Sequence, residues 1–293
     1  MIHISPRQLE VFVQVALHGS VRAAAEQLYL TQPAASMALA QMEGQLGMPV
    51  FARERGRLRL NTRGRELLPL ARELLARHAE FARAGGATDA ALSGELRVGA
   101  SNTVGNYRVD ELLGTFVRAH GEVVIRLRVA NTQAIAKGVL EHELDVGCVE
   151  GPVSNPALEA RPWRDDALLV CVPPQHPLAR KRRLQPADFA GARWVLREPG
   201  SATRATSERV LAQLPAGETV LELDQIEAIK QAVVAGLGIA CLPAVAVTDA
   251  LAAGRLCALK TPFLDLQRKL SVLLRRQTYR GALLDAFLRD IGV

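Results

Sequence analysis

The chain has 293 residues, enough for two or three globular domains, and a composition of 49% hydrophobic and 23% charged residues that argues against a disordered protein. No basic start leads into an apolar run, and no apolar stretch approaches the ~20 residues that cross a bilayer, so we expect a cytoplasmic protein with no membrane partner. The formal net charge of +6 hints at a polyanionic partner, and six arginines crowd residues 53–65 against the single acid Glu54.

Two short helices are expected on either side of residues 29–31. Ser20 can cap the first, and Thr31 can cap the second, in which Pro33 falls in the first turn and Gly47 follows the last apolar position. A preceding helix over residues 7–18 adds apolar residues to the same small core. Three helices of this size predict a helix-turn-helix, whose second helix lies in the major groove, although a helical hairpin that merely packs has a similar pattern.

The next segment favours DNA binding over simple packing. The stretch VFARERGRLRLNT, residues 50–62, alternates around Gly56 and predicts a β-hairpin wing with projecting arginines. Arginines beside a groove neutralise phosphates and enter narrow minor grooves.

The first 65 residues resemble the winged helix-turn-helix of LysR-type transcriptional regulators, on the motifs SVRAAAEQLYLTQPAAS and LGMPVFARERGRLRLNTRG. The resemblance implies binding to a promoter dyad in double-stranded DNA and contact with RNA polymerase. Members usually carry Arg or Lys where this chain has Met37 and Ala40, which leaves fewer direct base contacts, and Met37 could instead meet a thymine methyl group. The expected DNA-binding residues are Thr31, Gln32, Pro33, Ser36, Met37, Arg53, Arg55 and Arg57.

One long helix is predicted from Thr62 to about Ala84. Apolar residues and His78 recur along it at alternating intervals of four and three, a heptad seam that needs a partner, and Pro69 should kink its first turns. The seam comprises Leu67, Ala71, Leu74, His78 and Phe81. In LysR-type proteins this linker helix forms the dimer, and the family usually forms tetramers. Residues 85–94 are predicted to be a flexible hinge.

After Gly94 strands and helices alternate, which predicts an α/β fold. Strands are expected at 95–101, 123–131, 144–150, 167–174, 193–198, 219–224, 238–243 and 269–276, and helices at 105–119, 132–141, 201–213, 225–235 and 279–291. The resemblance implies two Rossmann-like subdomains, as in periplasmic binding proteins. The expected domains are 1–61 for DNA binding, 62–93 for the linker and 94–293 for the effector, the last divided into 94–166 with 266–293 and 167–265.

Polar residues follow four of these strands and begin the next helices. Because ligands of α/β sheets bind beyond the carboxyl ends of strands, we expect these residues to surround a small-molecule effector, although each one could be only a helix cap. Hydroxyls and amides with little aromatic surface suit a small oxyanion. The expected residues are Ser101, Asn102, Thr103, Asn131, Thr132, Gln133, Glu150, Ser201, Thr203, Gln225 and Glu227.

Three segments look similar to the LysR subgroup that senses sulfite, sulfate or O-acetylserine: REPGSATRATSERVL, LDQIEAIKQAVVAGLGIACLP and VEGP. Sulfite or sulfate is therefore the first candidate effector. Glu150 is a complication, since a carboxylate repels an anion unless it is protonated or paired. It could select among anions, pair with Arg204 or Lys230, or be a solvated residue at the edge of the site.

Other classes of protein fit less well. The six histidines are scattered without an HxH or HExxH pattern, so we expect no catalytic residue, no metal and no cofactor. A solute receptor would lack the wing and carry a signal peptide. Two alternatives stay open within the regulator class: a redox sensor that uses cysteines, and a regulator that senses an organic or amino-acid metabolite. The cysteines form no CxxC pair, and we expect them to be buried and inert: Cys148, Cys171, Cys241 and Cys257.

Overall fold

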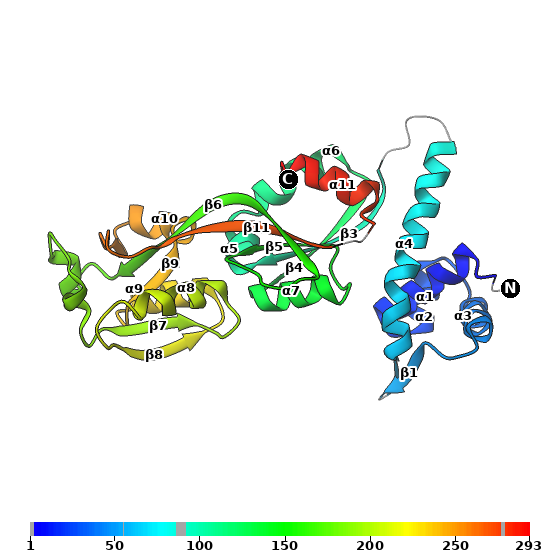
Figure 1. Ribbon diagram of the computed structural model, residues 1–293, viewed down its shortest axis with the longest axis horizontal. Helices are drawn as coiled ribbons and strands as arrows, with labels where there is room; N and C mark the ends of the chain where they lie inside the picture. The colour runs from blue at the N-terminus through cyan, green and yellow to red at the C-terminus, as the bar shows by residue number, and fades with distance from the viewer. Residues whose placement is uncertain (1–2, 55, 86–91, 277–278) are drawn as a thin grey trace. The chain divides into compact units, whose positions relative to one another are not determined.

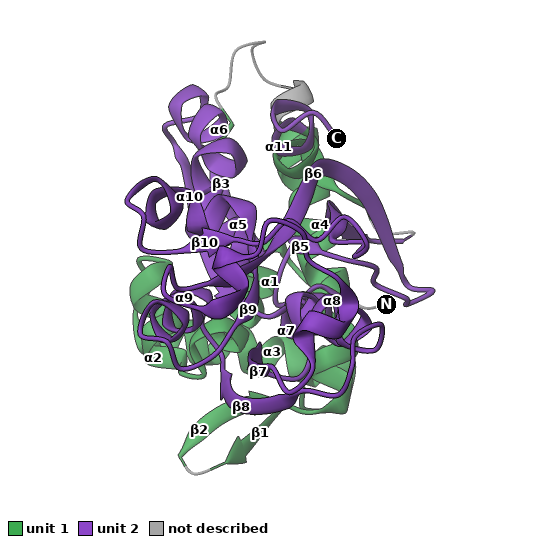
Figure 2. Ribbon diagram, turned by 90° about the vertical axis from the view of Figure 1, so that its left-hand side faces the viewer, with its two compact units in different colours: residues 1–92, 279–285 green, residues 93–278, 286–293 purple. Residues whose placement is uncertain are grey.

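The computed structural model describes residues 3–54, 56–85, 92–276 and 279–293. The chain divides into two compact units, one of residues 1–92 with 279–285 and one of residues 93–278 with 286–293 (Figure 2). Within the described residues no helix is long and apolar enough to cross a membrane.

The first unit begins with three helices, α1 (Pro6–His18), α2 (Val21–Gln27) and α3 (Gln32–Leu46) (Figure 1). A hydroxyl side chain caps each of them: Ser5, Ser20 and Thr31 accept hydrogen bonds from backbone N–H groups of the first turns. The caps expected at Ser20 and Thr31 are confirmed. The helices bury one small core, to which they contribute Val11, Phe12, Val15, Ala24, Ala25, Ala35, Leu39 and Met42.

Two short antiparallel strands follow, β1 (Phe51–Glu54) and β2 (Arg57–Leu60), and they form the expected wing. Phe51 is buried edge-to-face against Phe12, with ring centroids 5.7 Å apart. The N–H of Leu58 donates to the carbonyl oxygen of Gly19 at 2.9 Å. Gly19 has a φ of 66°, so a residue with a side chain would be strained at this contact. Both strands of the wing are therefore attached to the helical core.

The helix α4 (Thr62–Gly85) continues past Pro69. Its start is capped by Asn61, whose side-chain oxygen accepts from the N–H of Gly64 at 2.8 Å. Leu68 and Ala71 are buried in the core of the first unit, whereas farther along the helix Leu74 and Phe81 are exposed. The hinge expected at 85–94 lies largely outside the described residues.

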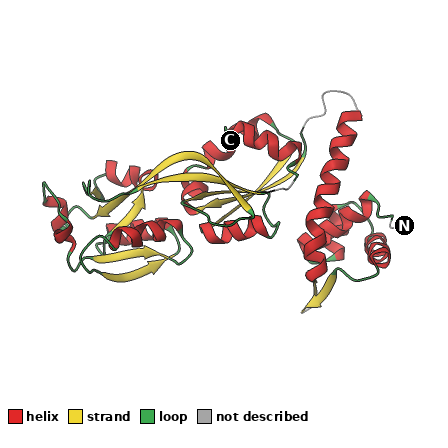
Figure 3. Cartoon of the chain, in the orientation of Figure 1, coloured by secondary structure: helices red, strands yellow, loops and turns green. Residues whose placement is uncertain are grey.

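The second unit is built on a seven-stranded sheet whose path runs β10-β6-β11-β5-β3-β4, with β9 also paired to β6 (Figure 3). Parallel pairing joins β3 (Gly94–Ser101) to β4 (Val123–Ala130) and to β5 (Val146–Glu150). The antiparallel strands are β6 (Leu158–Val172), β9 (Ala240–Pro243), β10 (Cys257–Ala258) and β11 (Gln267–Arg275). A separate parallel pair consists of β7 (Arg193–Arg197) and β8 (Glu218–Leu223).

The strand β6 changes partner along its length. Up to Ala167 it pairs with β11, and from Leu168 onward it pairs with β9 and β10. This change divides the second unit into a first half, with β3, β4 and β5, and a second half, with β7, β8, β9 and β10. It falls beside the subdomain boundary expected between residues 166 and 167.

Helices lie along both halves. In the first half they are α5 (Asn102–Tyr107), a π-helix (Asp110–Gly114), α6 (Thr115–Ala119), α7 (Thr132–Leu140) and the end of α11 (Gly281–Asp290). In the second half they are α8 (Ala202–Leu211), α9 (Ile226–Val234), α10 (Ala244–Ala252) and two 3-10 turns, Pro177–Arg180 and Pro186–Phe189.

Besides β10 and the two 3-10 turns, which were not predicted, three longer elements differ from the expectation. The helix expected at 105–119 is broken into α5, a π-helix and α6, and its first turn begins three residues earlier because Ser101 caps it. The strand expected at 167–174 begins at Leu158, where charged residues and Pro162 hide the pattern; the pairing with β11 shifts register beside this proline, which is where a strand tolerates one. The helix α10 was not predicted, since its Ala- and Val-rich run follows a strand without a capping residue.

Candidate DNA-binding surface and effector site

The helix α3 presents its first turns to solvent. Thr31 caps the helix through its Oγ1, which accepts from the N–H of Ala34 at 3.4 Å. Because Ala35, Leu39 and Met42 hold the opposite face in the core, the outward face carries the side chains expected to meet the groove. These exposed residues are Thr31, Gln32, Pro33, Ser36 and Met37, with Met37 62% exposed.

The wing, which follows α3 in the chain, exposes basic side chains. Arg53 on β1 and Arg57 on β2 are exposed, whereas Arg59 lies 3.5 Å from the carboxylate of Glu54, which partly neutralises it. Arg55 lies outside the described residues. The arginines form a cationic hairpin, the charge that phosphates attract.

Tyr29 lies in the turn expected between α2 and α3, but its exposure and backbone conformation were not predicted. It is 97% exposed and has a φ of 54°, a conformation that residues other than Gly and Asn seldom adopt. Only the break between two capped helices signals this turn in the sequence.

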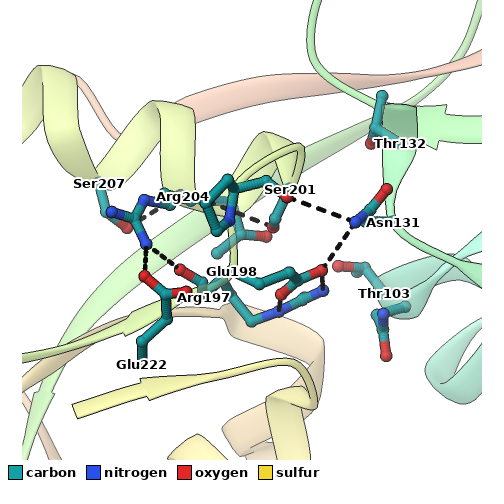
Figure 4. A network of polar contacts seen from close by, with 12 residues as sticks. Thr103, Asn131, Thr132, Arg197, Glu198, Ser201, Arg204, Ser207 and Glu222 are labelled. Carbon is teal, nitrogen blue, oxygen red and sulfur yellow. Dashed lines mark hydrogen bonds and ion pairs between the residues drawn. The ribbon is translucent and has the colours of Figure 1, made fainter. Parts of the chain in front are cut away.

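In the second unit, the capping residues Asn131 and Ser201 lie in one polar region together with Thr103 from the first turn of α5 (Figure 4). Ser101 caps α5 after β3, Asn131 caps α7 after β4, and Ser201 caps α8 after the loop that follows β7. Both the capping role and the placement at strand ends agree with the expectation.

Arg268 on β11 is the centre of this region. Its guanidinium donates from Nε to Asp166 Oδ2 at 2.6 Å, from Nη1 to Thr203 Oγ1 at 2.9 Å and from Nη2 to Thr103 Oγ1 at 3.2 Å. All four residues are buried. Since Thr103 belongs to α5 and Thr203 to α8, one side chain joins the first turns of helices from both halves.

Glu150, at the end of β5, is buried beside Arg268. Its Oε1 accepts from the N–H of Thr103 at 3.2 Å, and its Oε2 accepts from the hydroxyl of Thr132 at 3.3 Å. The nearest cation is Arg268 Nη2, 4.0 Å from Oε1. Burial raises the pKa of Glu150, but the Arg268 guanidinium and the hydrogen bonds from Thr103 and Ser101 outweigh burial and lower the pKa below its usual range. Glu150 is therefore ionised at neutral pH.

The pairings suggested for Glu150 were wrong. Arg204 pairs with Glu208 and Glu222, and Lys230 pairs with Glu227, so neither reaches Glu150. The exposed-edge alternative also fails, because Glu150 is 3% exposed. The true partner, Arg268, could not be found from the sequence. It is the second residue of β11 and does not follow the end of a strand, where the candidate residues were sought.

A second set of contacts crosses between the halves. Asn131 Nδ2 donates to Glu198 Oε1 at 3.1 Å, and the N–H of Gln133 donates to the carbonyl oxygen of Gly200 at 3.2 Å. Glu198 also accepts two hydrogen bonds from the neighbouring Arg197, at 2.7 and 2.8 Å. The carboxylate of Glu198 is thus shared between Asn131 of the first half and the buried guanidinium of Arg197.

Three of the expected effector residues do not take part in the contacts around Arg268 and Glu150. Asn102 is buried but accepts from Asn106 Nδ2, and Gln225 is exposed at the start of α9 without a side-chain cap. Glu227 accepts from the hydroxyl of Tyr107 at 3.1 Å, a further contact between the halves. Burial and then the Glu227 carboxylate raise the pKa of Tyr107 to about 12, which keeps its phenol protonated as a donor.

The second unit offers little for metal or thiol chemistry. Among the described residues no group of three or more His, Cys, Asp or Glu side chains is placed to hold a metal ion. Burial raises the pKa of Cys148, Cys171 and Cys241 to about 12. On the paired strands β6 and β9, Cys171 lies opposite Ala240 and Cys241 opposite Val170, so the two thiols point to opposite faces of the sheet.

A capped helix-turn-helix with a cationic wing, followed by a two-part α/β unit, defines a DNA-binding transcriptional regulator with a ligand-binding unit. Residues 6–65 match the model of the bacterial regulatory helix-turn-helix protein, lysR family, and residues 89–291 match that of the LysR substrate binding domain. The chain belongs to the LysR family and is a transcriptional regulator, not an enzyme.

Relatives extend over nearly the whole chain. It is 38% identical to the HTH-type transcriptional regulator YeiE of Escherichia coli (strain K12), over 98% of this chain and 97% of that protein. It is 34% identical to the RuBisCO operon transcriptional regulator of Allochromatium vinosum, over 81% of this chain and 79% of that one. The same fold occurs in full-length OxyR of Pseudomonas aeruginosa, with a TM-score of 0.79, 24% identity and coverage of 99% and 95%. The regulatory domain of CcmR from Synechocystis, solved in complex with 2-PG, has a TM-score of 0.63 and 26% identity, over 68% of this chain and 96% of that one.

Proposed function

We propose that this regulator responds to a small oxyanion, with sulfite or sulfate first in line, bound at the polar region between the two halves of the second unit. The observation that carries the proposal is the convergence of buried hydroxyls on a buried guanidinium: Thr103 and Thr203 both contact Arg268. Hydroxyls and a guanidinium are the groups that replace the hydration shell of an oxyanion. The proposed effector residues are Ser101, Thr103, Thr132, Ser201, Thr203 and Arg268, with Glu150 as the residue that selects among anions.

The second candidate is an amino-acid or other organic metabolite. The buried carboxylate of Glu150 favours this class, because it could pair with an ammonium group as readily as it pairs with Arg268. The solved CcmR domain with 2-PG shows that a LysR-type domain takes an organic molecule. A redox-sensing mechanism is less well supported, since the thiols of Cys171 and Cys241 lie on opposite faces of the sheet.

We propose that two chains pair through α4 and bind a promoter dyad in the cytoplasm, with pairs of dimers forming tetramers and with RNA polymerase as a further partner. The exposed Leu74 and Phe81 support the pairing, because a 4-3 spaced apolar seam on one helix is stabilised by a second helix. Residues 1–61, 62–93 and 94–293 are the proposed DNA-binding, linker and effector domains. A ligand that holds the two halves together would change the spacing of the DNA-binding units within such an oligomer.

Calorimetry of the full chain tests the effector. We expect sulfite or sulfate to bind and to raise the melting temperature, since a ligand at 100 times its dissociation constant adds about 2.7 kcal/mol. Thr203→Val removes one hydroxyl with little change in volume and should weaken binding. Thr261→Val, a buried threonine outside the polar region, is the matched control and should keep the parent affinity. If sulfite, sulfate, thiosulfate and phosphate give no heat while an amino-acid derivative binds, the oxyanion assignment is wrong.

A further inference from the structure

Three ionisable side chains are buried together at the proposed effector site, and their charges do not cancel. Glu150 is 3% exposed, Asp166 is 5% exposed and Arg268 is 8% exposed. Asp166 lies 2.6 Å from Arg268 Nε, and Glu150 lies 4.0 Å from Arg268 Nη2. Two carboxylates thus share one guanidinium, and the buried group carries a formal charge of −1.

The surroundings compensate this charge only in part. The contacts that β3, α5 and α7 make with Glu150 come from uncharged groups on Ser101, Thr103 and Thr132. On the other side, Arg108 lies 3.8 Å from Asp166 but also pairs with Glu111 at 2.7 Å. Glu111 in turn lies 3.5 Å from Arg164, so the two further arginines neutralise Asp166 and Glu111, and among the described residues neither forms an ion pair with Glu150.

An anion that enters this site meets a carboxylate in a buried environment. Like charges in low dielectric repel strongly, and one of two neighbouring anionic groups then takes up a proton. Asp166 accepts a hydrogen bond from Arg268 Nε at 2.6 Å and lies 3.8 Å from Arg108, so it is the better paired of the two carboxylates. Glu150 lies farther from Arg268 than Asp166 does, at 4.0 Å against 2.6 Å, and is therefore the group that can become neutral. Protonation also converts one of its oxygens from an acceptor into a donor, which an anion can accept.

We propose, on the basis of the oxyanion function above, that the effector anion binds together with one proton, which Glu150 takes from solvent, while Arg268 is the cation that faces the anion. The N–H of Thr103 and the hydroxyl of Thr132, which now donate to Glu150, then become donors for the anion. No bond other than the new O–H of Glu150 forms or breaks, and nothing is oxidised or reduced. The site therefore senses the anion and the proton jointly.

The sign of the pH dependence follows directly. Without ligand the Glu150 carboxylate is ionised at neutral pH, and with the anion bound its pKa is raised, so binding takes up a proton in the pH range between the two values. Within that range the affinity for an anion of constant charge should rise by up to tenfold for each unit by which the pH falls. Sulfate and thiosulfate are suitable probes because both remain doubly charged throughout the neutral range.

The test is titration calorimetry of the full chain with sulfate and with thiosulfate, in two buffers of different ionisation enthalpy at one pH, repeated across the neutral range. We expect about one proton to be taken up per anion and the affinity to fall as the pH rises. Glu150→Gln should abolish both the proton uptake and the pH dependence, and it should bind sulfate more tightly than the parent at the alkaline end. Glu143→Gln, an exposed glutamate paired with Arg128, is the control and should behave as the parent.

Binding without proton uptake in the parent overturns this inference and leaves the proposed oxyanion function intact. Uptake that persists unchanged in Glu150→Gln also overturns it, because another group would then carry the proton. If neither dianion binds the parent or the Glu150→Gln protein, this inference fails, and the oxyanion function is then decided by the calorimetry with sulfite and phosphate described above. Should Glu150→Gln not fold, the buffer dependence of the parent still decides the number of protons taken up.

Discussion

Gly200 and Gln133 are in direct contact across the two halves of the second unit. The carbonyl oxygen of Gly200 accepts from the N–H of Gln133 at 3.2 Å, and a Cβ built on residue 200 would lie 2.5 Å from Gln133 Oε1. Gly200 also has a φ of 86°, which a residue with a side chain seldom adopts. The absence of a side chain at this position is what allows the loop after β7 to reach the start of α7.

Gly200→Ala should therefore destabilise the second unit by two separable effects, the left-handed backbone and the overlap with Gln133. Gly236→Ala is the matched control, since its φ is 76° and nothing lies within 4 Å of the added Cβ. Gln133 Oε1 can rotate away, but Gln133 Cβ at 3.2 Å stays close, so we expect Gly200→Ala to lower the free energy of unfolding by roughly 1 kcal/mol more than Gly236→Ala, the lower end of the usual cost of overpacking. The measurement is urea unfolding followed by tryptophan fluorescence, because both tryptophans, Trp163 and Trp194, belong to this unit. Equal losses in the two variants would mean that the halves do not touch at Gly200 in solution.

The wing arginines should contribute to DNA affinity through charge. Arg57→Ala should weaken binding to all sequences and reduce the slope of log affinity against log salt by roughly 0.9 for each lost phosphate contact. Arg53→Ala should act in the same way. Arg126→Ala, an exposed arginine of the second unit, is the control for net charge and should keep the parent slope. If the Arg57→Ala protein kept the salt dependence of the parent, Arg57 would not contact a phosphate.

The first turn of α3 should instead contribute to sequence selection. Gln32 is exposed directly after the Thr31 cap, and a side-chain amide in the major groove can bond an adenine edge through two atoms. Gln32→Ala should cost about 1–3 kcal/mol on the preferred operator and much less on unrelated DNA. Fluorescence anisotropy with both DNAs measures the difference. An equal loss on the two DNAs would show that Gln32 positions the protein without reading bases.

Local chemistry made the helix starts predictable. The capping residues Ser20, Thr31, Ser101, Asn131 and Ser201 each follow a break in the apolar pattern and accept a hydrogen bond from an N–H group a few residues ahead, so sequence neighbours decide their capping role. The alternating strands of the second unit were predictable for the same reason. Wherever a residue's partner is within a few positions, the sequence pattern contains the interaction.

Contacts between distant segments were not predictable in this way. Arg268 lies 165 residues from Thr103 and 102 residues from Asp166, and nothing near it in the sequence marks it as different from the other arginines of a basic chain. The choice of Arg204 or Lys230 as the partner of Glu150 failed because both have local acidic neighbours that satisfy them first, Glu208 and Glu227. The strand β6 was only half predicted because its polar first part becomes a strand through pairing with β11.

The exposed seam on α4 should hold two chains together. Leu74 is 56% exposed in the single chain, so Leu74→Glu should change the stability of the monomer little. In a symmetric pair the same change would bury two like charges opposite each other and should cost several kcal/mol of dimer stability, with a loss of DNA affinity because the half-sites are no longer tethered. Light scattering reports the mass of the oligomer. Leu237→Glu, an exposed leucine outside the helix, is the control, and an unchanged mass in the Leu74 variant would exclude pairing through this seam.

The cysteines should be inert in the folded protein, with one exception. Burial holds the pKa of the Cys148, Cys171 and Cys241 thiols at about 12, so roughly one thiol in 10⁴ is ionised at pH 8, and only the thiolate reacts. Cys257 is only partly buried and should be the single fast-reacting thiol toward a disulfide reagent, with all four reacting after unfolding.

Cys257→Ser should remove that fast phase, and peroxide should leave the DNA affinity of the parent unchanged. Because the folded pKa values lie above the unfolded ones, raising the pH from 7 to 9 should accelerate labelling of the buried thiols only through transient opening. Fast labelling of two or more thiols in the folded protein would contradict this expectation. A change in DNA binding by peroxide that Cys171→Ala or Cys241→Ala abolishes would restore the redox mechanism.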